Sequence, residues 1–169
     1  MSGEQGLLEV EKKKSAVEHW DSILDEYEKS VGMPPFMAPG DETELQGYLS
    51  MNRDHLEKLD EEDCKAVAFR LGQFSFHVQR AQNREIARVN WAKSTIKTNL
   101  AHAVSNYKAY SYEERLYQAT KDDDAAKKLN QIAIYAQQRS DRLNFLATGI
   151  KNLSDIMKSI YFSKRSNHE

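Results

Sequence analysis

The feature that most constrains the fold is an apolar periodicity between residues 129 and 160. Apolar residues alternate three and four positions apart, as Leu129, Ile132, Ala136, Leu143, Leu146, Ile150, Leu153, Met157 and Ile160. Arg139 is the one polar residue in this series. A series of roughly four heptads predicts a long helix with a coiled-coil face.

The apolar face of this helix needs a surface to pack on, and two interpretations are open. It can close on the chain's own helix over residues 65–109, or on other subunits. Because so long a face leaves much apolar surface for a small chain to cover, a homo-oligomer is favoured. The residues expected to drive assembly are Leu143, Leu146, Ile150, Leu153 and Met157.

A second long helix is expected over residues 65–110, where Gly72 is the only glycine and no proline occurs. An apolar stripe opens at Val67 and continues to Val78, then resumes at Ile86. The step from Val78 to Ile86 breaks heptad spacing, so a shift of packing face or a local adjustment of the supercoil is expected there.

Shorter elements precede and connect the two long helices. A helix is expected over residues 7–30, followed by a linker over 32–40 that holds all three prolines. Asp41 and Glu44 resemble a capping box that starts a helix over 41–59, and Ser111 with Glu114 predicts a short helix from about Tyr112.

The predicted fold is all-α: two long helices form a helical hairpin or coiled coil, with shorter N-terminal and connecting helices. The chain is expected to divide into two parts. Residues 1–40 form an acidic N-terminal helix with its linker, and residues 41–169 form a helical domain for oligomerisation and nucleic-acid binding.

Charge is segregated along the chain. Residues 1–60 carry 6 Lys/Arg and 14 Asp/Glu, whereas residues 61–169 carry 18 and 12, although the net charge is only −2. Between Lys65 and Tyr110 eight basic residues stand against one acid, Glu85. A polyanion responds to such a local field rather than to net charge.

The basic stretch combines cations with aromatic rings, as single-stranded nucleic acid requires. Arg80, Arg84 and Arg88 are four residues apart and share a helix face. The predicted phosphate contacts and stacking residues are Arg80, Arg84, Arg88, Lys93, Lys97, Tyr107, Lys108 and Tyr110. Two other interpretations are open: a solvated face, or arginines paired with the acids of residues 1–60. Tyr107 can equally be a core residue.

The sequence carries no signature of an enzyme, a metal site or a cofactor. It has no glycine-rich phosphate loop and no Gly-x-Ser-x-Gly elbow, and its five histidines are scattered. Cys64 is the only cysteine, which excludes an internal disulfide and is typical of a reducing compartment. No apolar run reaches the ~20 residues of a membrane helix. A cytoplasmic protein is expected, in the host cytoplasm if the source is a phage.

The region from about residue 65 to 165 resembles the UvsY-like phage recombination mediators. The similar segments are the basic helix ending in YKAY, the helix start KDDDAAKKL, the helix IAIYAQQRSDRLNFL and the basic end IKNLSDIMKSIYFSKR. This resemblance implies a ring-like homo-oligomer whose basic helix contacts DNA. It also implies contacts with a recombinase and with a single-strand-binding protein.

Two functions follow as expectations. The first is a non-enzymatic single-stranded-DNA-binding mediator that assists loading of a recombinase onto DNA, in which charge reversal at Arg84 and Arg88 abolishes DNA binding. The second is a phage virion structural protein, or a helical adaptor or scaffold, whose basic face docks on acidic protein surfaces.

Overall fold

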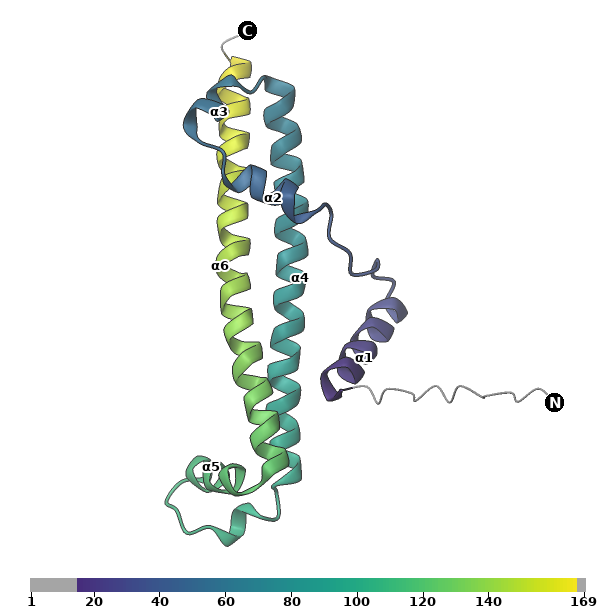
Figure 1. Cartoon of the computed structure of the whole chain (residues 1–169), viewed down its shortest axis with the longest axis vertical. Helices are drawn as coiled ribbons and strands as arrows, with labels where there is room; N and C mark the ends of the chain where they lie inside the picture. Colours follow the sequence, from purple (N-terminus) through teal and green to yellow (C-terminus); the bar gives the residue numbers. More distant parts are fainter. Residues whose placement is uncertain (1–14, 167–169) are drawn as a thin grey trace, which may run out of the picture. The chain divides into compact units, whose positions relative to one another are not determined.

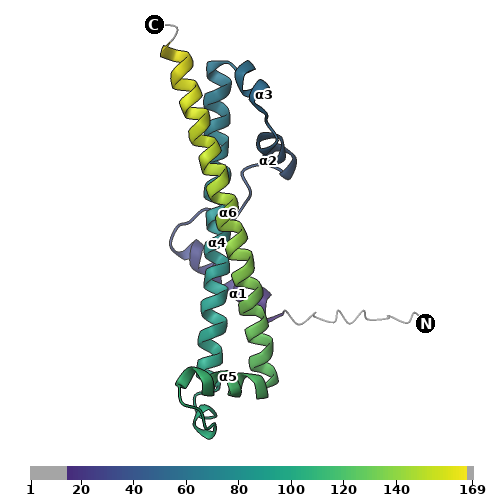
Figure 2. The ribbon, with the colours of Figure 1, turned by 90° about the vertical axis from the view of Figure 1, so that its left-hand side faces the viewer.

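The computed structural model describes residues 15–166, and every regular element in that range is helical (Figure 1). The elements are α1 (Ala16–Ser30), α2 (Glu42–Leu49), α3 (Arg53–Lys58), α4 (Glu61–Asn99), the 3-10 turn η1 (Val104–Asn106), α5 (Tyr112–Asp122) and α6 (Asp124–Ser166). The chain divides between Phe36 and Met37 into two compact units. The predicted all-α class is confirmed, and α4 and α6 pack along each other as a helical hairpin in the second unit (Figure 2).

The first unit contains α1. The Ser15 hydroxyl accepts a hydrogen bond from the Glu18 amide at 3.2 Å, and the Glu18 carboxylate accepts one from the Ser15 amide at 2.7 Å. This reciprocal pair is a capping box. After the helix, Gly32 has a φ of +74°, a left-handed conformation that favours glycine. Residues 7–14 of the predicted helix lie outside the described residues.

The single helix predicted over residues 41–59 is wrong, because the structure has two helices there. The Asp41 carboxylate accepts from the Glu44 amide at 2.7 Å and starts α2, as predicted. Ser50 then ends α2, and the Asn52 side chain accepts from the His55 amide at 3.0 Å to start α3. The break allows both short helices to cover the core between α4 and α6, through the partly buried side chains of Leu45, Tyr48, Met51, Leu56 and Leu59.

An ion pair fixes α2 against α4. Arg70 Nε and Nη2 donate to the Glu44 carboxylate at 2.8 and 2.6 Å, and Nη2 also donates to the Pro39 carbonyl at 3.0 Å. A β-carbon at Gly40 would collide with the Glu44 carboxylate, so this close approach favours glycine. The hydrogen bonds from Arg70 lower the pKa of Glu44. Their stabilising contribution is therefore present above the unfolded-state pKa and is lost as the pH falls through the lower folded value.

The seam between the long helices is centred on small residues of α6. These residues repeat every seven positions and are buried, as Ala126, Ala133, Ser140, Ala147 and Ser154. Among the residues of the predicted apolar series, Ala136, Ile150 and Met157 are buried, while Leu143, Leu146 and Leu153 pack beside them and are partly buried. The predicted face is therefore confirmed in part and is rotated toward the small side chains, which allow the two helices to approach closely.

Two serines set the register of this seam. Ser75 Oγ of α4 donates to the Ala147 carbonyl of α6 at 3.3 Å, and Ser154 Oγ of α6 donates to the Ala68 carbonyl of α4 at 2.9 Å. Each hydroxyl is buried and is satisfied by the opposite helix. The antiparallel pairing therefore places residue 75 beside 147 and residue 68 beside 154.

Glu85 of α4 and Arg139 of α6, the charged residues that interrupt the apolar patterns of these helices, form an ion pair with each other. Glu85 is 7% exposed at the seam, and its Oε2 lies 3.0 Å from Arg139 Nη2 across the hairpin. Arg88 also pairs with Glu85 from one turn further along α4. Of the two outcomes expected after Val78, the shift of packing face is wrong, because Glu85 occupies the next buried heptad position and Ile86 is 40% exposed.

The helix predicted to reach Tyr110 ends at Asn99 instead. The chain then turns through η1, and Leu100 and Val104 are buried in a second core with Ile96 of α4. Ala119 of α5 and Ala126 of α6 complete this core. Burial of Leu100 and Val104 against α5 and α6 outweighs the local preference for continued helix.

Replacing Ala147 with Leu is expected to lower the free energy of unfolding by about 1–3 kcal/mol, although it extends the leucine pattern of α6. The reason is overpacking, because Ala147 is 2% exposed and its carbonyl accepts from Ser75 of the opposite helix. Urea denaturation measures the difference. The matched control is Thr148→Leu at the neighbouring exposed position, for which a change within about 0.5 kcal/mol is expected. Equal stabilities of the two variants would contradict the close approach of the helices.

Candidate nucleic-acid interface

The three arginines predicted to contact phosphate do not form a fully exposed stripe. Arg80 is 9% exposed, and Arg84 and Arg88 are partly buried. The Arg88 side chain is 16% exposed and is paired with Glu85. Their role in binding phosphate is untested and stays a prediction.

Lys93 and Lys97 lie further along α4 and are exposed. They line a groove of about 610 Å³ where the end of α4, the helix α5 and the first turns of α6 meet. The other lining residues are Ile96, Glu113, Leu116, Tyr117, Thr120, Lys121, Lys127, Asn130 and Gln131. We call this the loop-end groove.

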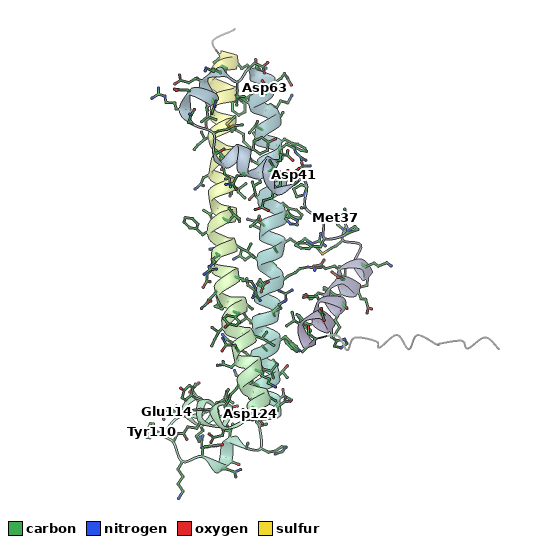
Figure 3. The ribbon with its side chains drawn as sticks, in the orientation of Figure 1. Met37, Asp41, Asp63, Tyr110, Glu114 and Asp124 are labelled. Atoms are coloured by element: carbon green, nitrogen blue, oxygen red, sulfur yellow. The ribbon has the colours of Figure 1, made fainter. Side chains whose placement is uncertain are left out.

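Local sequence signals build the walls of the loop-end groove. Ser111 and Glu114 form the predicted capping box and start α5. The Asp123 carboxylate accepts from the Ala126 amide at 2.7 Å, so the acidic segment starts α6 as a cap. Glu114 and Asp124 both lie at this end of the hairpin (Figure 3). The short α5 packs against α6 and η1, and residues of α4, α5 and α6 line one groove.

Lysines outnumber acids among the residues that line the loop-end groove. Lys93, Lys97 and Lys121 form no ion pair with any residue in the described range 15–166, while Lys127 Nζ lies 2.7 Å from Asp124 Oδ1. Lys127 Nζ donates a hydrogen bond to the Asp124 carboxylate, and this bond raises the pKa of Lys127. Four lysines therefore surround the groove against one lining acid, Glu113. Such a cluster attracts phosphate oxygens and raises their local concentration.

Apolar and aromatic groups lie among these lysines. Ile96 is buried and Leu116 is partly buried in the second core, and both line the groove. Tyr117 is 69% exposed, so its ring is available to a ligand. An exposed ring beside several cations is the combination on which nucleic-acid bases stack while phosphates bind nearby.

The predicted stacking residues divide between core and surface. Tyr107 is partly buried against the second core, and its hydroxyl donates to Asp122 Oδ2 at 2.9 Å, which raises its pKa. This is the core alternative recognised from the sequence. Tyr110 is fully exposed (Figure 3), and Lys108 is also exposed; both residues lie in the segment between η1 and α5. None of the three lines the loop-end groove.

The site prediction omitted Tyr117, Lys121 and Lys127. Antiparallel pairing of α4 and α6 brings residues 93–97 beside residues 127–131, and α5 contributes Tyr117 and Lys121 to the same groove. The sequence signal was the basic start of the last helix together with the capping box at Ser111.

The residues predicted to drive assembly lie in the chain's own core. Ile150 and Met157 are fully buried, and Leu143, Leu146 and Leu153 pack against the same cluster as residues of α4. The apolar seam thus closes within one chain. A role of these five residues in assembly stays a prediction.

Metal ligands, the single cysteine and possible membrane spans were also considered among residues 15–166. No group of three or more His, Cys, Asp or Glu side chains in that range is placed to hold a metal ion. Cys64 is buried, and burial raises the pKa of its thiol, which disfavours the reactive thiolate. Among the described helices, none is both long enough and apolar enough to cross a membrane.

Comparisons with protein-family models, with curated proteins and with solved structures found no match. The resemblance to the UvsY-like mediators therefore rests on the quoted sequence segments alone and stays a prediction.

Proposed function

We propose that this protein is a non-enzymatic single-stranded-DNA-binding mediator that holds a DNA strand in the loop-end groove and presents it to a recombinase. The observation that carries the proposal is the convergence of Lys93, Lys97, Lys121 and Lys127 from three helices around an exposed tyrosine. Lysines at separate points of a groove can follow successive phosphates. Tyr117 can stack on a base that is not paired.

A single strand fits this groove better than a duplex does. Stacking on Tyr117 needs an unpaired base, and the partly buried apolar side chain of Leu116 suits the face of a base rather than a phosphate. The mediator role is supported by the resemblance over residues 65–165. In that role the protein would weaken a competing single-strand-binding protein and transfer the strand to a recombinase.

Fluorescence anisotropy of a labelled single-stranded oligonucleotide tests the proposal. Binding is expected to weaken as salt rises, because each phosphate contact releases counterions. A duplex of the same length is expected to bind less tightly, and Tyr117→Ala is expected to reduce that preference. Absence of binding at low salt would overturn the proposed function.

A helical adaptor or scaffold is the second candidate, and exposed aromatic side chains favour it. Phe69, Phe76, Phe145 and Phe162 are between 60% and 83% exposed. Large apolar side chains on a surface commonly mark contacts with other proteins. If oligonucleotides fail to bind and an acidic protein surface binds the lysines instead, the adaptor function replaces the mediator function.

A further inference from the structure

An uncharged stripe runs along the outer face of α4. Its members are spaced three and four residues apart and are all exposed: Phe69, Gly72, Phe76, Gln79, Asn83, Ile86 and Asn90. The stripe is about 32 Å long at 1.5 Å per residue. It begins one turn after Lys65 and two turns after Glu62, and Lys93 and Lys97 follow it at the same spacing. We call residues 69–90 of this face the uncharged stripe.

The uncharged stripe has the properties of a surface that is covered in an assembly. Phe69 and Phe76 are 66% and 63% exposed, which is costly for two neighbouring aromatic rings in water. A β-carbon at Gly72, between them, would meet no atom within 4 Å, so an open slot separates the rings. The side chains of Gln79, Asn83 and Asn90 make no hydrogen bond within the described part of the chain.

We infer that the uncharged stripe binds the same stripe of a second copy of this chain, with the two α4 helices antiparallel about a twofold axis near Gln79. In this register, the numbers of two residues that face each other across the dimer add up to 158 or 159. Ile86 of one copy then lies opposite Gly72 of the other and enters the slot between Phe69 and Phe76. Phe76 lies opposite Asn83, and the two Gln79 side chains lie opposite each other.

Charge complementarity at the ends selects the antiparallel arrangement. Glu62 of one copy lies opposite Lys97 of the other at both ends of the pair, and the Glu62 side chain is 81% exposed. A parallel pair would instead place lysine beside lysine and glutamate beside glutamate. In the antiparallel pair Lys65 and Lys93 oppose each other, and the ion pair between Lys65 and Glu62 at 3.8 Å reduces that repulsion.

Nucleic acid is a poorer occupant for this face. Within residues 69–90 the stripe carries no cation, so it offers nothing to a phosphate backbone. The inference goes beyond the proposed function and does not depend on it. A bound strand and a second copy would compete for Lys93 and Lys97, so self-association is measured without nucleic acid.

Sedimentation equilibrium of the full chain tests the inference directly. A dimer in exchange with monomer is expected, and Phe76→Glu is expected to weaken it at least tenfold, because it places a charge at the centre of the contact. Phe145→Glu on α6 is the matched control, since Phe145 is 83% exposed and lies outside the stripe. A chain that stays monomeric, or equal weakening by both variants, would overturn the inference.

A charge-swap cycle tests the register. Glu62→Lys and Lys97→Glu are each expected to weaken the dimer, and the double variant is expected to recover it because both opposite-charge pairs are restored. If the double variant loses as much dimerisation free energy as the two single variants lose together, the antiparallel register is excluded. Circular dichroism of each variant checks that helix content is retained.

Cysteine cross-linking tests the position of the axis. Gln79→Cys is expected to form a covalent dimer with a short bismaleimide, since the two side chains meet at the axis. Asn90→Cys is expected to remain uncoupled, because its copies would lie about 32 Å apart at 1.5 Å per residue. The native Cys64 is fully buried and does not compete. Efficient coupling through Asn90→Cys, or none through Gln79→Cys, would contradict the proposed axis.

Discussion

Replacing both Lys97 and Lys121 with glutamine is expected to lower the affinity for single-stranded DNA about tenfold at 0.15 M salt. Each phosphate contact on a single strand contributes about 0.7 to the slope of log affinity against log salt. Losing two contacts should therefore reduce that slope by about 1.4. The two lysines come from α4 and α5, and neither forms an ion pair within residues 15–166, so their removal leaves no acid uncompensated there. Anisotropy titrations at several salt concentrations measure both quantities.

The matched control removes the same charge from elsewhere in the second unit. Lys58 of α3 and Lys151 of α6 are exposed and line no part of the loop-end groove. Lys58→Gln with Lys151→Gln is expected to change the slope little. If both pairs of substitutions weaken binding equally, the protein presents a diffuse positive field, and the groove has no special role.

The second large effect is expected from Ile150→Ala, which should lower the free energy of unfolding by about 2–5 kcal/mol. Ile150 is fully buried between α4 and α6, so the substitution leaves a cavity in the main core. Ile156→Ala is the matched control, because Ile156 lies on the same helix and is 50% exposed. Denaturation in urea at two protein concentrations gives the comparison.

The dependence of the stability change on protein concentration distinguishes a role of Ile150 in the chain's own core from a role in assembly. A residue of the chain's own core lowers stability by the same amount at every concentration. A residue whose main role is assembly instead shifts the oligomeric state, and its cost grows where the oligomer is populated. An effect of Ile150→Ala that depends on concentration would favour the assembly role.

Much of the fold was predictable from local sequence. The spacing from Leu129 to Ile160, and the near absence of glycine and proline over residues 61–110, predicted two long helices. Capping signals at Asp41 and Ser111 correctly marked helix starts. These features act between neighbours in sequence, which is why they can be recognised without a structure.

The errors occurred where distant residues determine local structure. The helix ends at Asn99 because Leu100 and Val104 are buried with residues of α5 and α6. Glu85 and Arg139, each an exception in its own helix, form a pair across the hairpin. Neither contact can be inferred from one helix alone.

The candidate site was partly predictable for the same reason. Basic residues and tyrosines were recognised by type, and Lys93 and Lys97 do line the loop-end groove. The arginines upstream are buried or partly buried, and Tyr107 packs against the core. Burial and pairing decide which cations a ligand can reach, and both depend on the packing of the helices.

The sequence by itself determined that this protein is all-α with two long amphipathic helices, because helix periodicity and capping are local properties. Only the tertiary structure decided which residues form the seam and which cations meet in a groove. The small residues of α6 became the centre of the seam because close approach of two helices depends on both surfaces at once. Lys121 and Lys127 joined Lys93 and Lys97 because the hairpin turn brings together residues that are about 30 positions apart in sequence.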